Sequence, residues 1–167
     1  MCRFFKSLLL LIALGTSVTA ASQGRYPVRK VYAYLQPVKQ GAGGRYDAPR
    51  QQESRKYLYL ALWPGRSVEV VQLWLDGAAT AFTVASTSAP VTISTTPALL
   101  KGQRTLQTLV PEGPHTVLQL LAQNAAEVSA PYPRGIRNYP VLIAYRAAGK
   151  LFYVGAHWRI LNAEVKE

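Results

Sequence analysis

The sequence predicts an all-β protein, an antiparallel β-sandwich of about eight or nine strands and of immunoglobulin-like or jelly-roll-like type. After residue 20, the chain consists mostly of short segments rich in Val, Leu, Tyr and Thr, separated by Gly and Pro. That pattern is typical of strands joined by turns. Two of the reversals, at Asp76-Gly77 and Ala148-Gly149, suit two-residue hairpin turns. The same pattern also allows an up-and-down β-barrel as the alternative.

Strands are expected near residues 28–36, 57–63, 68–75, 78–84, 91–95, 105–110, 116–121, 141–147 and 151–160. The first two are separated by residues 40–56, a stretch with several glycines, Pro49 and few apolar side chains. This composition predicts a basic, mobile loop.

The run VEVVQLWL-DG-AATAFTV predicts a hairpin turning at Asp76-Gly77, because Asp tolerates and Gly prefers the positive φ of a type I′ turn. In that register Leu75 faces Ala78, and the expected core face carries Val71, Leu73, Phe82 and Val84. Trp74 falls on the opposite, more polar face, where another strand covers it or where it stays open to a partner.

Two further hairpins are expected. Residues 105–121 contain Pro-Glu-Gly-Pro, which suits a tight reversal, although Thr116 followed by Gln119 also matches a capping box and leaves open a helix over 116–128. The last hairpin turns at Ala148-Gly149, and Gly155 within it indicates a bulge or a close approach of another backbone. Its expected core face carries Val141, Ile143, Tyr145, Phe152, Val154, Ala156 and Trp158.

The first twenty residues have the organisation of a secretory signal peptide. Arg3 and Lys6 precede an apolar run, Ser7 to Gly15, that is too short to cross a bilayer comfortably, and small residues follow up to Ala20. We expect cleavage after residue 20 to leave a single domain over 21–167 in the periplasm or outside the cell, without a transmembrane helix. The only cysteine, Cys2, lies within this signal.

The formal net charge of +11 is unevenly distributed, with nine basic and two acidic residues between Arg25 and Arg66. Outside the cytoplasm such a region favours acidic glycans, lipopolysaccharide or anionic lipids as partners, and nucleic acid is not expected. The candidate anion-binding residues are Arg45, Arg50, Arg55 and Lys56. The alternative is a solvated basic surface that keeps the protein soluble.

Residues 130–140, APYPRGIRNYP, combine tyrosines with arginines, a composition found in protein and glycan recognition surfaces. The alternative is a rigid proline loop whose tyrosines cap the end of the sandwich. The candidate partner-binding residues are Trp74, Tyr132, Arg134, Arg137 and Tyr139.

Motifs for catalysis or metal binding are missing from the sequence. His115 and His157 have no metal-ligand spacing, and only Glu69 among the acidic residues is expected on a strand. No nucleophile elbow, Walker A loop or dinucleotide fingerprint occurs. We therefore expect no catalytic residue, no metal and no cofactor.

At the run VQLWLDGAATAFTV, followed by PVTI and TLVPEGPHTVLQL, the chain resembles small uncharacterised secreted β-rich proteins of Gram-negative envelopes. The resemblance implies no activity, substrate or site residue. The expected function is a non-enzymatic exported envelope protein that binds, or gives structural support to, a protein, glycan or anionic surface. The alternatives are a polyanion binder, for lipopolysaccharide or acidic glycan, and a small extracellular hydrolase.

Overall fold

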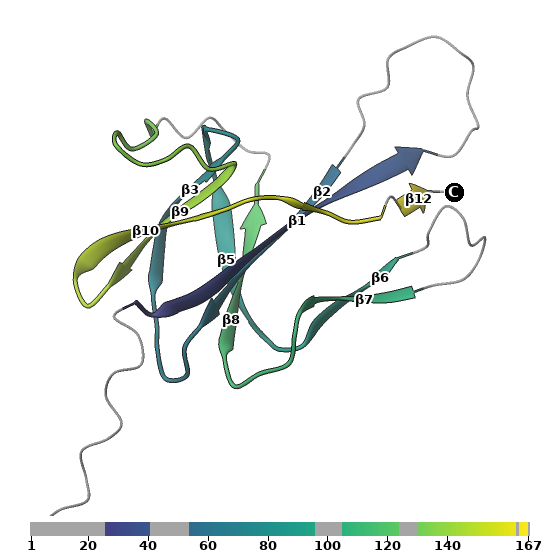
Figure 1. The fold of residues 1–167 in the computed structure, drawn as a ribbon, viewed down its shortest axis with the longest axis horizontal. Coiled ribbons are helices and arrows are strands. Elements are labelled where there is room, and N and C mark those ends of the chain that lie inside the picture. The colour runs from purple at the N-terminus through teal and green to yellow at the C-terminus, as the bar shows by residue number, and fades with distance from the viewer. Residues whose placement is uncertain (1–25, 41–53, 96–104, 124–129, 163, 167) are drawn as a thin grey trace, which may run out of the picture.

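The computed structural model describes residues 26–40, 54–95, 105–123, 130–162 and 164–166, and every regular element in them is a strand (Figure 1). The all-β prediction is therefore confirmed. In chain order the strands are β1 (Val28–Gln40), β2 (Ser54–Leu62), β3 (Glu69–Leu75), β4 (Ala78–Thr80), β5 (Phe82–Ser88), β6 (Val91–Thr95), β7 (Thr105–Val110), β8 (Thr116–Ala122), β9 (Val141–Ala147), β10 (Lys150–Ala156), β11 (Arg159–Ile160) and β12 (Glu164–Lys166).

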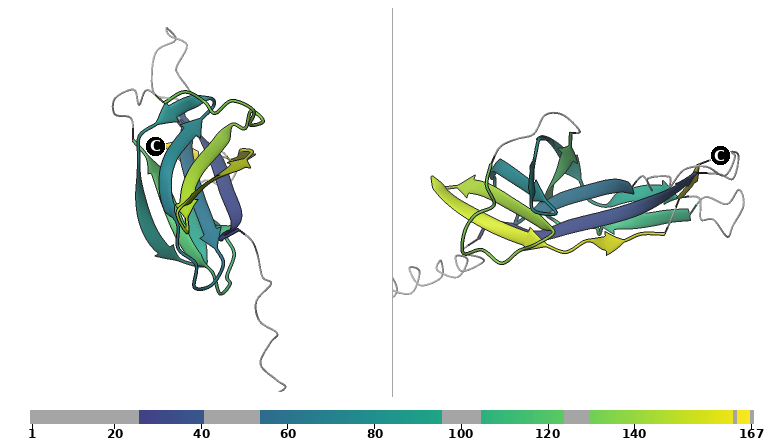
Figure 2. Two further views of the ribbon diagram at one scale, coloured as in Figure 1. Left: turned by 90° about the vertical axis from the view of Figure 1, so that its left-hand side faces the viewer. Right: turned by 90° about the horizontal axis from the view of Figure 1, so that it is seen from above.

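The described strands form three sheets. The first has the order β11-β1-β2-β8-β5, with β12 also beside β1; the second has the order β10-β9-β3-β4; β6 and β7 form a separate ribbon. All pairs are antiparallel except those of β11 and β12, which run parallel to β1 (Figure 2). The alternative of a closed barrel is wrong, because the first sheet ends at β5 without returning to β11.

The main core lies between the six-stranded and four-stranded sheets. Leu58, Leu60 and Leu62 of β2 belong to one buried cluster with Leu73 and Leu75 of β3. Complete burial of each leucine contributes about 1.5–3 kcal/mol. The same cluster includes Ala33, Leu120, Val141 and Ile143.

A second buried cluster lies on the other face of β1 and β2, where the β6–β7 ribbon packs. Tyr32, Tyr34 and Tyr59 contact Leu109 and Val110 of β7 there. The hydroxyl of Tyr34 donates a 2.6 Å hydrogen bond to the carbonyl of Leu109. Since both faces of β2 are covered, its last five residues are all buried instead of alternating between buried and exposed.

The hairpin at Asp76-Gly77 is confirmed, with φ angles of 52° and 86° and Leu75 opposite Ala78. The strand expected over 78–84 is nevertheless two strands in different sheets, because β5 pairs with β8 and not with β3. Its predicted core face is wrong at Val71 and Val84, which are 39% and 45% exposed. Val71 is the extra residue of a bulge opposite β9, and Val84 lies on an edge strand.

The hairpin at Ala148-Gly149 is also confirmed, with φ angles of 47° and 73° and Arg146 opposite Leu151. Its predicted core face is buried or half-buried throughout. The predicted strand over 151–160 is divided into β10 and β11.

The predicted hairpin over residues 105–121 is wrong, although both of its strands exist. Strand β7 pairs with β6, whereas β8 lies between β2 and β5 in another sheet. The alternative of a helix over 116–128 is wrong for residues 116–122, which form β8. Residues 124–129 and most of the predicted loop 40–56 lie outside the described residues.

Candidate binding surface

The segment 130–140 covers the outer face of the four-stranded sheet. Trp74, Leu142 and Ala144 are buried there, and Tyr132 and Tyr139 pack against them. Trp74 is only 5% exposed, and its Nε1 donates a 3.1 Å hydrogen bond to the carbonyl of Ala130. Trp74 therefore lies beneath the segment and holds it in place. The sequence prediction that Trp74 is a partner-binding residue is not supported, because its side chain is not open to a partner.

Hydrogen bonds fix the shape of this segment. The hydroxyl of Tyr132 donates to the carbonyl of Arg137 at 2.9 Å and accepts from the backbone N–H of Tyr139 at 3.0 Å. At its end, the carbonyl of Pro140 accepts a 2.7 Å bond from the backbone N–H of Asp76. One tyrosine hydroxyl thus closes the loop on itself, and a second contact attaches it to the β3–β4 turn.

The ring of Tyr139 lies directly over Gly155 of β10. A Cβ atom at Gly155 would overlap carbon atoms of that ring, closer than real Cβ atoms approach a neighbour. The β9–β10 register shows no shift at Gly155. The glycine therefore makes room for an aromatic side chain, and neither the predicted bulge nor a close backbone is the reason for it.

Several side chains of this region remain open to solvent. Tyr153 is 41% exposed, and its ring centroid lies 6.4 Å from that of Trp74. The exposed His157 lies 5.5 Å from the Tyr139 ring, and the guanidinium carbon of Arg137 lies 5.7 Å from the same ring. We call this region the aromatic surface, and define it as Tyr132, Tyr139, Tyr153 and His157 with Arg134 and Arg137.

The aromatic surface combines partly exposed rings with cations. Arg134 and Arg137 are exposed, and neither forms an ion pair with an acidic side chain in the described residues. Amphipathic rings bury apolar area while keeping a polar edge available, and guanidinium groups bind carboxylate, sulfate or phosphate groups through two parallel hydrogen bonds. Chemically, this surface is suited to a partner that has flat apolar faces and anionic groups.

Sequence reasoning did not place Tyr153 or His157 among the candidates. The sequence nevertheless contains a pattern that indicates this surface. Residues 153, 155 and 157 fall on one face of the predicted strand, and Gly155 between the two rings indicates a close contact there. Segment 130–140 could not be assigned to that face from sequence, since the packing is between distant parts of the chain.

The four candidate anion-binding residues do not form one described site. Arg45 and Arg50 lie outside the described residues. Lys56 is engaged, because its Nζ lies 3.5 Å from Asp76 Oδ2 and 5.7 Å from the centre of the Trp158 ring. Arg55 lies at the exposed start of β2, and consecutive side chains of a strand point to opposite faces of the sheet. Arg55 and Lys56 therefore do not converge.

His115, predicted as a turn residue, is only 8% exposed in the connection between β7 and β8. Its Nδ1 lies 3.5 Å from a guanidinium nitrogen of Arg29, which also lies over the ring of Trp63. Its Nε2 has no hydrogen-bond partner in the described residues. Across those same residues, no group of three or more His, Cys, Asp or Glu side chains is placed to hold a metal ion.

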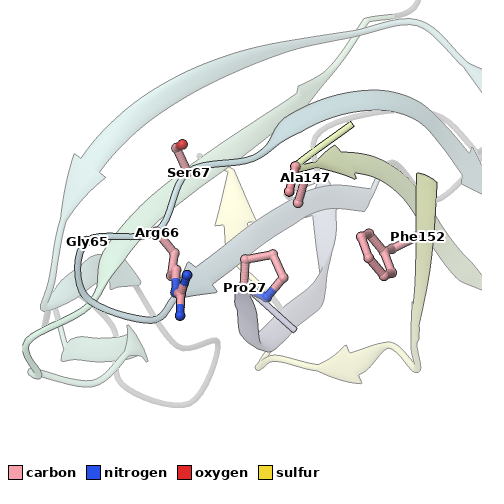
Figure 3. Close-up of a pocket in the computed structure, with 7 residues that line it drawn as sticks. Pro27, Gly65, Arg66, Ser67, Ala147 and Phe152 are labelled. Atoms are coloured by element: carbon pink, nitrogen blue, oxygen red, sulfur yellow. The ribbon is translucent and has the colours of Figure 1, made fainter. Parts of the chain in front are cut away.

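A small cleft of about 250 Å³ lies at the other end of β9 (Figure 3). Arg66 lies beside Pro27 on one side of it and Phe152 closes the opposite side, as the figure shows. The remaining lining residues are Gly65, Ser67, Ala147 and Ala148. The only charged group of this lining is a guanidinium, which offers contact to an anion but no general acid or base at neutral pH.

In comparisons with known proteins, no family model, no curated protein and no solved structure matches this chain. The resemblance to secreted envelope proteins stays a prediction. No helix in the described residues is long and apolar enough to cross a membrane.

Proposed function

We propose that this protein is a non-enzymatic exported module of the cell envelope that binds an acidic glycan through the aromatic surface. One observation supports this most strongly: the rings of Tyr139 and His157 lie next to each other, the guanidinium of Arg137 lies over the Tyr139 ring, and Arg137 has no ion-pair partner in the described residues. Export rests on the signal-like residues 1–20.

A preformed surface supports binding. Because the Tyr132 hydroxyl and the backbone of Asp76 already hold residues 130–140 in place, little conformational entropy is lost when a ligand docks. Ring faces stack against the apolar faces of sugar units, and the guanidinium groups of Arg134 and Arg137 bind the acidic substituents. We also infer that the two sheets with a common core form a sandwich of the immunoglobulin-like or jelly-roll-like type.

A polyanion binder that uses the basic stretch is the rival proposal, supported by the charge excess between Arg25 and Arg66. The two proposals differ in their salt dependence, because interactions of exposed charges are largely screened beyond a Debye length of about 8 Å at physiological salt, whereas ring stacking is not. For the hydrolase alternative, no observation in the described residues offers support.

Binding of a heparin oligosaccharide and of lipopolysaccharide, measured by isothermal titration calorimetry, tests the proposal. Tyr153→Ala and Arg137→Gln should each weaken binding about tenfold, which corresponds to about 1.4 kcal/mol. Tyr26→Ala is the matched control, because Tyr26 is 58% exposed and lies against Phe152, outside the aromatic surface.

The basic stretch is tested in parallel with the combined change of Arg45, Arg50, Arg55 and Lys56 to Gln. If the aromatic surface binds the glycan, this variant should retain the part of the binding that persists at high salt. If instead it abolishes binding, and Tyr153→Ala and Arg137→Gln have no effect, the aromatic surface is not the glycan site.

A further inference from the structure

The six-stranded sheet ends in two different edges. Along β1, the short strands β11 and β12 of the same chain pair with Tyr34, Leu35 and Val38 to Gln40. At the other end, β5 pairs with β8 at seven positions, from Phe82 opposite Ala122 to Ser88 opposite Thr116. On its second side, β5 has no neighbouring strand in the described residues.

Strand β5 lacks the features that normally protect an edge. Its sequence, FTVASTS, has no charged residue and no proline, and its pairing with β8 has no register shift. The two edge strands of the four-stranded sheet differ, because β4 has only three residues and β10 begins with Lys150. An extended, uncharged edge presents unpaired backbone N–H and C=O groups to another strand.

We propose that β5 pairs with β5 of a second copy of this chain, in antiparallel orientation across a twofold axis at Ala85. In an antiparallel pair, two directly opposed residues either both hydrogen-bond to the partner strand or both point away from it. Because this property alternates along a strand, the twofold axis passes through a residue and not between two residues. Ala85 is the middle residue of β5, and an axis there pairs all seven positions. The resulting partners are Phe82 with Ser88, Thr83 with Thr87, and Val84 with Ser86.

Charge favours this edge as the place where two like-charged chains meet. The full sequence has a formal net charge of +11, of which Arg3 and Lys6 supply two positive charges, so residues 21–167 carry +9 and contact between two basic surfaces is repulsive. Neither β5 nor its neighbour β8 has a charged side chain, and pairs of Thr residues across strands are favourable. The pairing is independent of the glycan-binding proposal.

Sedimentation velocity of residues 21–167, which contain every described strand, tests this proposal over a dilution series. The mass should rise from one chain to two with concentration. Ala85→Lys and Ala85→Glu should each remain monomeric, because the axis places two like charges directly opposite one another. An equimolar mixture of the two variants should form a heterodimer, since opposite charges then face each other.

Leu151→Lys is the matched control, because Leu151 is 49% exposed on β10 and gives the same added charge away from β5. It should dimerise like the unchanged chain. Circular dichroism melts of the Ala85 variants should match the unchanged chain, since Ala85 is exposed. A chain that is monomeric at its highest soluble concentration would overturn the proposal. In that case the β5 edge would be available only to a strand of another protein. Dimers that persist in both Ala85 variants, or a mixture that stays monomeric, would also overturn it.

Discussion

The indole Nε1 of Trp158 donates a 3.1 Å hydrogen bond to Oδ1 of Asp76, which lies 82 residues earlier in the chain. The other carboxylate oxygen lies 3.5 Å from Nζ of Lys56, and that ammonium lies 5.7 Å from the Trp158 ring. One carboxylate therefore joins β2, the β3–β4 turn and the segment after β10. Asp76 also has the positive φ that the turn requires.

Asp76→Ala should lower the free energy of unfolding by about 1–3 kcal/mol, because it removes the hydrogen bond to the indole N–H and puts alanine in a left-handed conformation. Asp76→Asn should cost about 0–1 kcal/mol, since asparagine suits the turn and keeps an acceptor for Trp158, and only the exposed ion pair is lost. Urea unfolding measures both values. Equal losses would show that the bond to Trp158 does not contribute.

Trp74→Ala should destabilise the protein by about 3–5 kcal/mol and more than Phe82→Ala does. Trp74 is 5% exposed and holds segment 130–140 through Ala130, whereas Phe82 is half-buried on the edge strand. The sequence predicts the opposite order, because it assigns Phe82 to the core face of the hairpin and Trp74 to the more polar face. Unfolding in urea gives the two free energies, and a larger loss for Phe82→Ala would contradict the packing of the aromatic surface.

Gly155→Ala should cost about 1–3 kcal/mol, because the added methyl group collides with the ring of Tyr139. The backbone of Gly155 is not in the left-handed region, so the loss comes from the collision and not from strain. In a Tyr139→Ala background the same change should be almost neutral. A double-mutant cycle measures this coupling, and additive losses would exclude the contact.

Stability should decrease above about pH 10, where exposed tyrosines ionise. Burial raises the pKa of Tyr34, Tyr59 and Tyr145 above 10.0. The unfolded chain therefore loses these protons first, so the stabilisation present below pH 10 is lost as pH rises through the folded pKa values. Urea unfolding in alkaline buffers measures the slope, and Tyr59→Phe should make it smaller. A slope unaffected by Tyr59→Phe would show that Tyr59 does not contribute.

Local signals predicted the parts of the fold that depend on neighbouring residues. The turns at Asp76-Gly77 and Ala148-Gly149, and the register of each, follow from residues that tolerate positive φ between two strand-like runs. The bounds of β6, β7 and β9 match the prediction for the same reason.

Pairing between segments that are distant in the sequence could not be predicted from such local signals. The sequence does not show that the chain changes sheets at Ala81, or that β8 pairs with β2 and not with β7. The burial of Trp74 depends on a cover supplied by residues 130–140, and the pairing of Lys56 depends on Asp76. The candidate residues of segment 130–140 were therefore named from the sequence, while Tyr153 on β10 and His157 just after it were not.

Binding of an acidic glycan at the aromatic surface is tested residue by residue with two-dimensional amide NMR during titration with a heparin oligosaccharide, because each residue except proline gives its own backbone signal. The largest shift changes should fall on Tyr139, Tyr153 and His157, with Arg134 and Arg137, and they should persist at high salt. Shift changes confined to residues 25–66 and abolished by salt would contradict glycan binding at the aromatic surface, and would assign the binding to the basic stretch.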